Sequence, residues 1–182
     1  MTRTIAALLT LALLTAPTAA QDAVTEDDAR GFFDGPAEDA NELVRDGTYQ
    51  GAVAWLEGRL APEASFAIAG SVHTARGLAV TYQAALGREQ LTGLAATSTS
   101  PLAVGTQIWD FTLTSDVRRV TPLPDGEAAA VVTLTETGTL STAGAAALSA
   151  TFHSVADCTM RLGRANGSVV IEVAACEQVT MF

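Results

Sequence analysis

The chain has 182 residues, a formal net charge of −10 at pH 7 and only arginine among its ten basic residues. Nucleic acids and anionic lipid surfaces are bound by clustered lysine and arginine, so this composition excludes them as partners. A lysine Schiff base and a phosphate-binding P-loop are excluded as well, because both require a lysine.

The first twenty residues have the pattern of a secretory signal peptide. Arg3 precedes an apolar stretch from Ile5 to Leu14, which is too short to span a bilayer and has the length of a signal h-region. The small side chains from Thr18 to Ala20 predict cleavage before Gln21. We therefore expect a periplasmic or secreted protein without stable membrane insertion.

The rest of the chain fits one domain and is too short for two ordinary ones. Residues 21–40 are acidic and contain two glycines and a proline, which predicts an N-terminal arm with one helical turn around Phe32 and Phe33. We assign residues 41–182 to a single domain. Polyanionic partners would be repelled by its negative charge.

The first half of this domain has mainly helical periodicity. Residues 39–60 carry an apolar stripe at spacings of three and four, which predicts helix. Residues 65–72 predict a strand, with a helix end as the alternative, and residues 74–87 predict a second helix that has Tyr82 on its interior face. Residues 92–106 are rich in Thr, Ser, Gly and Ala and predict a connection.

From Gln107 the period changes from 3.6 to two, which is typical of half-buried strands. Turn residues at Pro122–Gly126 return the chain antiparallel, and Asn166–Gly167 is a strong hairpin signal. Four antiparallel strands are therefore predicted, beginning near Gln107, Ala128, Phe152 and Val169. Helices followed by a meander of strands indicate an α+β fold, with helices on one face of the sheet.

This order of elements resembles the NTF2-like, or SnoaL-like, superfamily. The segment from Trp55 to Phe66 looks like its second helix running into its first strand, and the resemblance covers about residues 40–182. It implies N-terminal helices packed on a strongly bent antiparallel sheet, a cone-shaped domain with a pocket at its wide end, and frequent dimerisation through the sheet. The superfamily includes isomerases, dehydratases, cyclases and binding-only members, and none of their catalytic sets aligns here.

Five residues are candidates for lining that pocket: Tyr82, Trp109, Glu136, Ser154 and Glu177. Alternation places Glu136 and Glu177 on the apolar faces of their strands, where burial raises the pKa of a carboxyl and suits it to proton transfer. The alternative is that both carboxylates reach water near the strand ends. Tyr82 and Trp109 have ordinary core packing as their alternative role.

Cys158 and Cys176, the two cysteines of the chain, lie on the last two predicted strands and predict a disulfide. A two-residue turn at Asn166–Gly167 sets Cys158 opposite Ala175, so the disulfide requires a β-bulge or a longer turn. One residue inserted before Cys176 turns Cys176 inward and Glu177 outward. The disulfide and an inward Glu177 are therefore competing predictions.

Three functions remain open. The first is an exported domain that binds a small, mostly apolar ligand, uncharged or cationic, without catalysis. The second is an isomerase, dehydratase or cyclase that uses Glu136 as proton acceptor, with Tyr82 or Trp109 orienting the substrate. The third is a dimeric envelope interaction protein that engages a partner through its sheet. No motif indicates a metal, a nucleotide or an organic cofactor.

Overall fold

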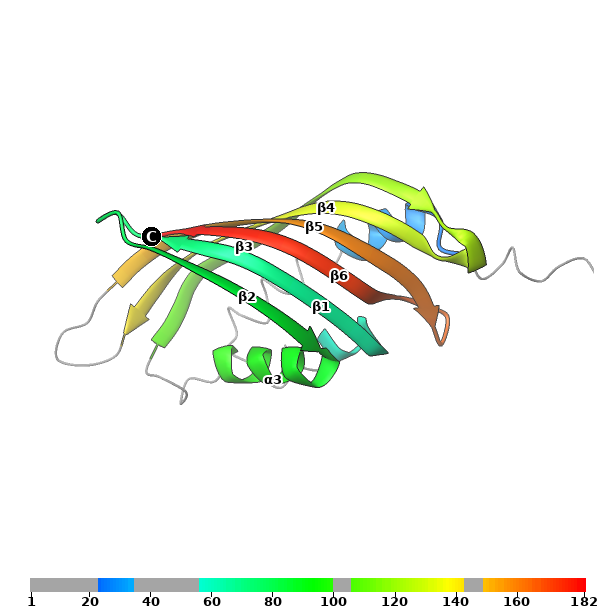
Figure 1. The fold of residues 1–182 in the computed structure, drawn as a ribbon, viewed down its shortest axis with the longest axis horizontal. Helices are drawn as coiled ribbons and strands as arrows, with labels where there is room; N and C mark the ends of the chain where they lie inside the picture. Colours follow the sequence, from blue (N-terminus) through cyan, green and yellow to red (C-terminus); the bar gives the residue numbers. More distant parts are fainter. Residues whose placement is uncertain (1–22, 35–55, 100–105, 143–148) are drawn as a thin grey trace, which may run out of the picture.

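The computed structural model describes residues 23–34, 56–99, 106–142 and 149–182. The elements are a helix over residues 26–34, β1 (Leu60–His73), β2 (Ala79–Gly87), α3 (Arg88–Thr99), β3 (Thr106–Pro122), η2 (Pro124–Gly126), β4 (Ala128–Thr142), β5 (Ser149–Ala165) and β6 (Ser168–Met181). One six-stranded sheet has the order β2-β1-β6-β5-β4-β3. Its strands are long and the sheet is strongly bent (Figure 1).

The sheet is mixed, which corrects the expected antiparallel sheet. The neighbouring strands pair antiparallel except for β1 and β6, which run parallel. The last strand therefore lies in the middle of the sheet, between β5 and β1. This pairing joins residues about a hundred positions apart, so no local pattern in the sequence specifies it.

One face of the sheet carries the core and is called the inner face here. Alternate residues of β4 and β5 are buried on this face: Ala128, Ala130, Val132, Cys158, Met160 and Leu162. The residues between them point to the opposite, outer face, and most of those on β5 are exposed. This period of two confirms the strands predicted from Gln107 onward.

The helix over residues 26–34 packs on this core through Phe32 and Phe33. It begins with a capping box, in which Thr25 and Asp28 each accept a hydrogen bond from the other's backbone N–H, at 3.0 and 3.1 Å. At its far end Ser115 Oγ donates to the carbonyl of Phe33 at 2.9 Å. The helical turn expected around the two phenylalanines is thus longer than predicted.

The helix predicted over residues 74–87 is wrong, because this segment forms a β-hairpin. β2 pairs with β1 from His73 opposite Ala79 to Ser65 opposite Gly87. The residues between the strands turn through Gly77, whose φ of 80° favours glycine. Apolar residues in this segment recur at spacings of two as well as four, and pairing with β1 selects the strand.

The neighbouring predictions are confirmed in part. The strand predicted over residues 65–72 lies within β1. The predicted connection over 92–106 is partly helical, because α3 extends to Thr99 and contacts β1 and β2. The predicted signal peptide, most of the helical stripe over 39–60 and residues 21–22 and 35–40 of the arm lie outside the described residues. In the described part of the chain, no helix is long and apolar enough to cross a membrane.

The disulfide between Cys158 and Cys176 is confirmed, with an S–S distance of 2.08 Å. The hairpin at Asn166–Gly167 has the expected two-residue turn, with Ala165 opposite Ser168. A bulge then follows, because Leu162 pairs with Ile171 whereas Arg161 pairs with Val173. The extra residue is Glu172, and it brings the two cysteines directly opposite each other, as the sequence required.

The same bulge settles the direction of the side chains that follow it on β6. Cys176 turns to the inner face beside the core, and Glu177 is exposed on the outer face. An inward Glu177 is therefore wrong. By the same alternation Gln178 and Thr180 turn inward, toward the residues of β5 that carry the core.

Candidate functional site

Five polar side chains form a row across the inner face, called the inner-face row here: Glu136, Ser154, Thr180, Gln178 and Tyr82. Glu136 of β4 lies opposite Ser154 of β5, and Ser154 lies opposite Thr180 of β6. Gln178 follows on the same face of β6. Tyr82 of β2 completes the row from the edge of the sheet.

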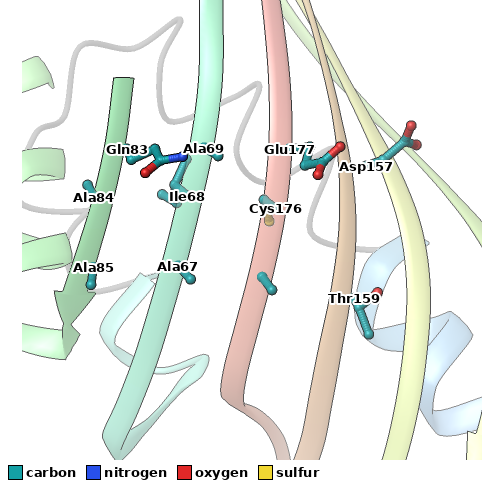
Figure 2. A pocket seen from close by; sticks show the side chains of 11 residues that line it. Ala67, Ile68, Ala69, Gln83, Ala84, Ala85, Asp157, Thr159, Cys176 and Glu177 are labelled. Carbon is teal, nitrogen blue, oxygen red and sulfur yellow. The ribbon is translucent and has the colours of Figure 1, made fainter. Parts of the chain in front are cut away.

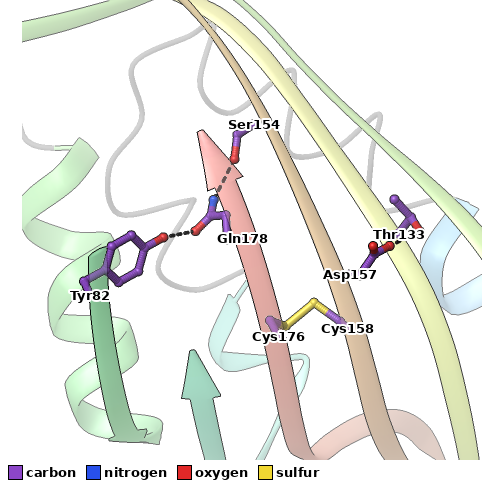
Figure 3. The surroundings of a disulfide bond; sticks show 7 residues. All are labelled: Tyr82, Thr133, Ser154, Asp157, Cys158, Cys176 and Gln178. Carbon is purple, nitrogen blue, oxygen red and sulfur yellow. Dashed lines mark hydrogen bonds between the residues drawn. A yellow bond between two sulfur atoms is a disulfide. The ribbon is translucent and has the colours of Figure 1, made fainter. Parts of the chain in front are cut away.

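Hydrogen bonds connect four members of this row, and Figure 3 shows those that join Tyr82, Gln178 and Ser154. The hydroxyl of Tyr82 donates to Oε1 of Gln178 at 2.6 Å, and Nε2 of Gln178 donates to Oγ of Ser154 at 2.7 Å. The hydroxyl of Thr180 also donates to Oγ of Ser154, at 3.1 Å. The chain of bonds thus runs in one direction and ends at Ser154, whose side chain is buried.

Gly70 makes the first of these bonds possible. β1 lies between β2 and β6, and Gly70 pairs with Tyr82 on one side and with Gln178 on the other. A Cβ atom at Gly70 would lie 2.5 Å from the Tyr82 hydroxyl and 2.7 Å from the carbonyl oxygen of Gln178. The tyrosine ring therefore crosses β1 only because this position has no side chain.

Glu136 is the charged member of the row. Burial raises the pKa of this carboxyl above its ordinary value of 4.5. Within the described residues, Glu136 forms neither a hydrogen bond nor an ion pair. Burial also raises the pKa of Tyr82, and the negative charge of Glu136 raises it further. Glu136 and Tyr82 therefore interact electrostatically across the row.

A second feature lies on the outer face, where an open hollow of about 650 Å³ crosses β2, β1, β6 and β5 (Figure 2). Its floor includes the small side chains of Ala67, Ala69 and Ala175, and Asp157 and Glu177 stand at its side. Both carboxylates are exposed. Among the described residues that line the hollow, none is a buried polar residue, so we assign the candidate site to the inner-face row instead.

The structure brings together three of the five predicted pocket residues: Tyr82, Glu136 and Ser154. Glu177 lies on the other side of the sheet, and the side chain of Trp109 lies outside the described residues. Within the described ranges, no three side chains of His, Cys, Asp or Glu gather in one place where they could hold a metal ion.

Sequence reasoning missed Gln178, Thr180 and Gly70. The first two follow from alternation once Cys176 is placed inward by its disulfide. The signal for Gly70 was a glycine inside a predicted strand, which marks a close approach of other atoms. Of the three, Gly70 depends on a pairing between strands that are distant in the sequence, β1 and β6.

No protein-family model matches the chain, and no curated protein sequence matches it. Solved structures are similar at low identity. LinA is 14% identical with a TM-score of 0.48, over 78% of this chain and 79% of LinA. ActVI-ORFA from Streptomyces coelicolor is 12% identical with a TM-score of 0.46, over 82% of this chain and 93% of that one.

An NTF2-like protein from Cytophaga hutchinsonii is 12% identical with a TM-score of 0.41, over 84% of this chain and 98% of that one. The described residues form an α+β domain similar to these proteins. At these identities and TM-scores, neither a family nor an activity is carried over to this chain.

Proposed function

We propose that this protein is an exported domain that binds a small molecule at the inner-face row. The observation that carries the proposal is the partly buried carboxyl of Glu136, which has no hydrogen bond or ion pair within the described residues. A buried carboxyl without a partner reduces the stability of a fold. A residue that is unfavourable for folding is readily explained by a role in binding or catalysis.

The surroundings of the row support a ligand that is mostly apolar and is uncharged or cationic. Phe66, Leu134 and Ala156 are partly buried hydrophobic residues packed against the core close to the row in the strand pairing. A few polar groups within an apolar surface are typical of small-molecule sites. An anionic ligand is disfavoured, because ionised Glu136 would repel it.

Export and the shape of the domain belong to the same proposal. The disulfide is consistent with an oxidising compartment, and the predicted signal peptide supports a periplasmic or secreted location. We expect the cone-shaped domain that the NTF2-like resemblance implies. Exposed Val173 and Val179 on the outer face of β6 support a homodimer through the sheet.

Native and denaturing mass spectrometry of the protein purified from the exported fraction tests this proposal. We expect the native mass to exceed the mass of the chain by that of a small molecule, and denaturation to release it. A protein that remains free of ligand, both as purified and after incubation with a library of small uncharged compounds, would contradict ligand binding. If that protein were a dimer, the interaction-protein function would replace the present proposal.

The second candidate function is a proton-transfer enzyme, and the raised pKa of Glu136 favours it. A carboxyl whose pKa is raised toward neutral pH exchanges protons with a substrate more readily than an exposed one. The discriminating variant is Glu136→Gln, assayed with the compound that mass spectrometry identifies. Loss of turnover with ligand binding retained would establish the enzyme, whereas absence of turnover in the unaltered protein leaves the binding function.

A further inference from the structure

The two histidines of the chain lie in one row with a methionine on three neighbouring strands. His73 of β1 pairs with Met181 of β6, and Met181 pairs with His153 of β5. Met181 is the last residue of β6, at the end of the strand that Figure 1 marks C. Residues that are far apart in the sequence thereby become neighbours.

All three side chains lie on the outer face of the sheet. Alternation from Cys176, which lies beside the core, places Met181 on the outer face of β6. Residues opposite one another on paired strands share a face, so His73 and His153 point outward with Met181. Both histidines are exposed, and Met181 is 50% exposed. An ion in solution therefore has direct access to these side chains.

The spacing of the three residues suits a shared ion. Neighbouring strands lie about 4.8 Å apart, so the Cα atoms of His73 and His153 stand about 10 Å apart, with Met181 midway between them. A histidine side chain is longer than one strand spacing. Both imidazoles can therefore lean over β6 and meet the thioether of Met181 at one ion.

Each histidine has a ring nitrogen available for a metal. Nε2 of His73 lies 2.9 Å from Oγ of Ser71, so an ion bound at Nδ1 leaves Nε2 to donate its proton to the serine. Histidines that bind metals commonly have their second nitrogen held in this way. Within the described residues, the ring of His153 forms no hydrogen bond or ion pair. Both rings can therefore bind an ion without losing an existing contact.

The kinds of ligand in the row determine the class of metal. A thioether sulfur is a soft ligand that selects Cu(I), and imidazole also binds copper. Calcium and magnesium require oxygen ligands such as carboxylates. The adjoining outer-face positions of the three strands are Ser71, Val179 and Val155, and none of these is a carboxylate. The surroundings therefore favour a soft ion over a hard one.

We propose that His73, Met181 and His153 form a binding site for one Cu(I) ion. This site goes beyond the proposed function and is independent of it, because the inner-face row lies on the opposite face of the sheet. The thioether distinguishes the site from a pair of surface histidines. The negative net charge of −10 also attracts a cation to the protein.

Anaerobic titration of the full exported protein with Cu(I) tests the proposal. Ascorbate keeps the metal reduced, and bicinchoninate competes for it as a coloured chelator. We expect the protein to withdraw one Cu(I) ion per chain from the chelator. Because Cu(I) is diamagnetic, NMR can follow the ligands directly. The methyl signal of Met181 and the ring signals of His73 and His153 should shift together, whereas the methyl signal of buried Met160 should not.

Two matched methionine variants test the role of the thioether. Met181→Leu removes the sulfur and retains an apolar side chain of similar size, and it should weaken Cu(I) binding by at least about tenfold. Met160→Leu makes the same change on the inner face and should bind Cu(I) as the unaltered protein does. Thiol titration confirms that Cys158 and Cys176 remain paired, because free thiolates would bind Cu(I) themselves.

Three results would overturn the proposal. The first is a protein that withdraws no Cu(I) from bicinchoninate. The second is an equal affinity for Cu(I) in Met181→Leu and in the unaltered protein. The third is a shift of the histidine signals without that of Met181, which would show a site made of histidines alone. None of these results bears on ligand binding at the inner-face row.

Discussion

Gly70 and Tyr82 face each other on β1 and β2, and the tyrosine ring occupies the space that a side chain at Gly70 would fill. The ring reaches across β1 to Gln178 on the parallel neighbour β6. Four strands are thereby connected on the inner face, from the edge strand β2 to β5. The absence of a side chain at Gly70 thus allows Tyr82 to join the inner-face row.

Replacing this glycine with alanine should therefore be destabilising. In Gly70→Ala the new methyl group meets both the Tyr82 hydroxyl and the backbone oxygen of Gln178. We expect the free energy of unfolding to fall by about 1 to 3 kcal/mol, as for other overpacked sites. Urea unfolding of Gly70→Ala and of the unaltered protein measures this difference in the free energy of unfolding.

Gly31→Ala is the matched control for that change. Gly31 lies in the helix over residues 26–34, and a Cβ atom there would meet nothing within 4 Å. Alanine at this position should raise the stability by about 0.5 to 1 kcal/mol. Equal effects of the two substitutions would contradict the close approach of Tyr82 to Gly70.

The disulfide should contribute substantially to stability. It joins cysteines 18 positions apart, and closing a loop of this size stabilises a fold by about 3 kcal/mol. Thiol titration of the denatured protein should find no free cysteine before reduction and both after it. Reduction should lower the urea midpoint of the unaltered protein and should leave that of a Cys158→Ala, Cys176→Ala variant unchanged. Two free thiols in the exported protein would contradict the pairing.

Glu136 should make stability depend on pH. Because burial raises the folded-state pKa of its carboxyl above 4.5, folding favours the protonated form. Its stabilising contribution is complete below pH 4.5 and is lost as the pH rises through the folded-state pKa. Glutamine does not titrate, so Glu136→Gln does not lose this contribution as the pH rises. The free energy of unfolding of Glu136→Gln, relative to that of the unaltered protein, should therefore increase from about pH 4 to about pH 8.

Urea unfolding across that range measures the effect. Glu177→Gln is the control for removing one negative charge, because Glu177 is exposed on the outer face. A difference between Glu136→Gln and the unaltered protein that stays constant with pH would contradict the burial of Glu136.

The ionisation of Tyr82 tests the distance between the two ends of the row. The chain has two tyrosines, so a Tyr49→Phe background leaves Tyr82 as the only one. Its pKa should lie above 10.0, first because the ring is partly buried and second because Glu136 is negatively charged.

Ultraviolet absorbance during an alkaline titration measures this pKa. In a Glu136→Gln, Tyr49→Phe variant the pKa of Tyr82 should be lower than in the background but still above 10.0, since burial remains. An unchanged titration curve would mean that Glu136 and Tyr82 do not interact.

The strands from Gln107 onward could be predicted from the sequence because alternation and turn residues are local signals. The disulfide and its bulge could also be inferred, since the turn at Asn166–Gly167 fixed the register that the bulge had to correct. The strand β2 could not, because its apolar spacing fits a helix as well as a strand and pairing with β1 decides between them.

The candidate site was partly predictable for the same physical reason. Glu136 and Ser154 lie on strands whose faces are fixed by local alternation. Gly70 and Tyr82 reach Gln178 through the parallel pairing of β1 and β6, which joins distant parts of the chain. Their contribution therefore becomes visible only when the sheet order is known.

The central claim is that a small molecule binds at the inner-face row. Ligand binding by one variant on each face of the sheet tests this claim most directly. Gln178→Leu removes the amide at the centre of the inner-face row, and Ala175→Leu fills part of the outer hollow. Native mass spectrometry of both, beside the unaltered protein, measures the fraction that carries the small molecule. We expect Gln178→Leu to lose the ligand and Ala175→Leu to retain it. The reverse result would place the ligand on the outer face and contradict the inner-face site.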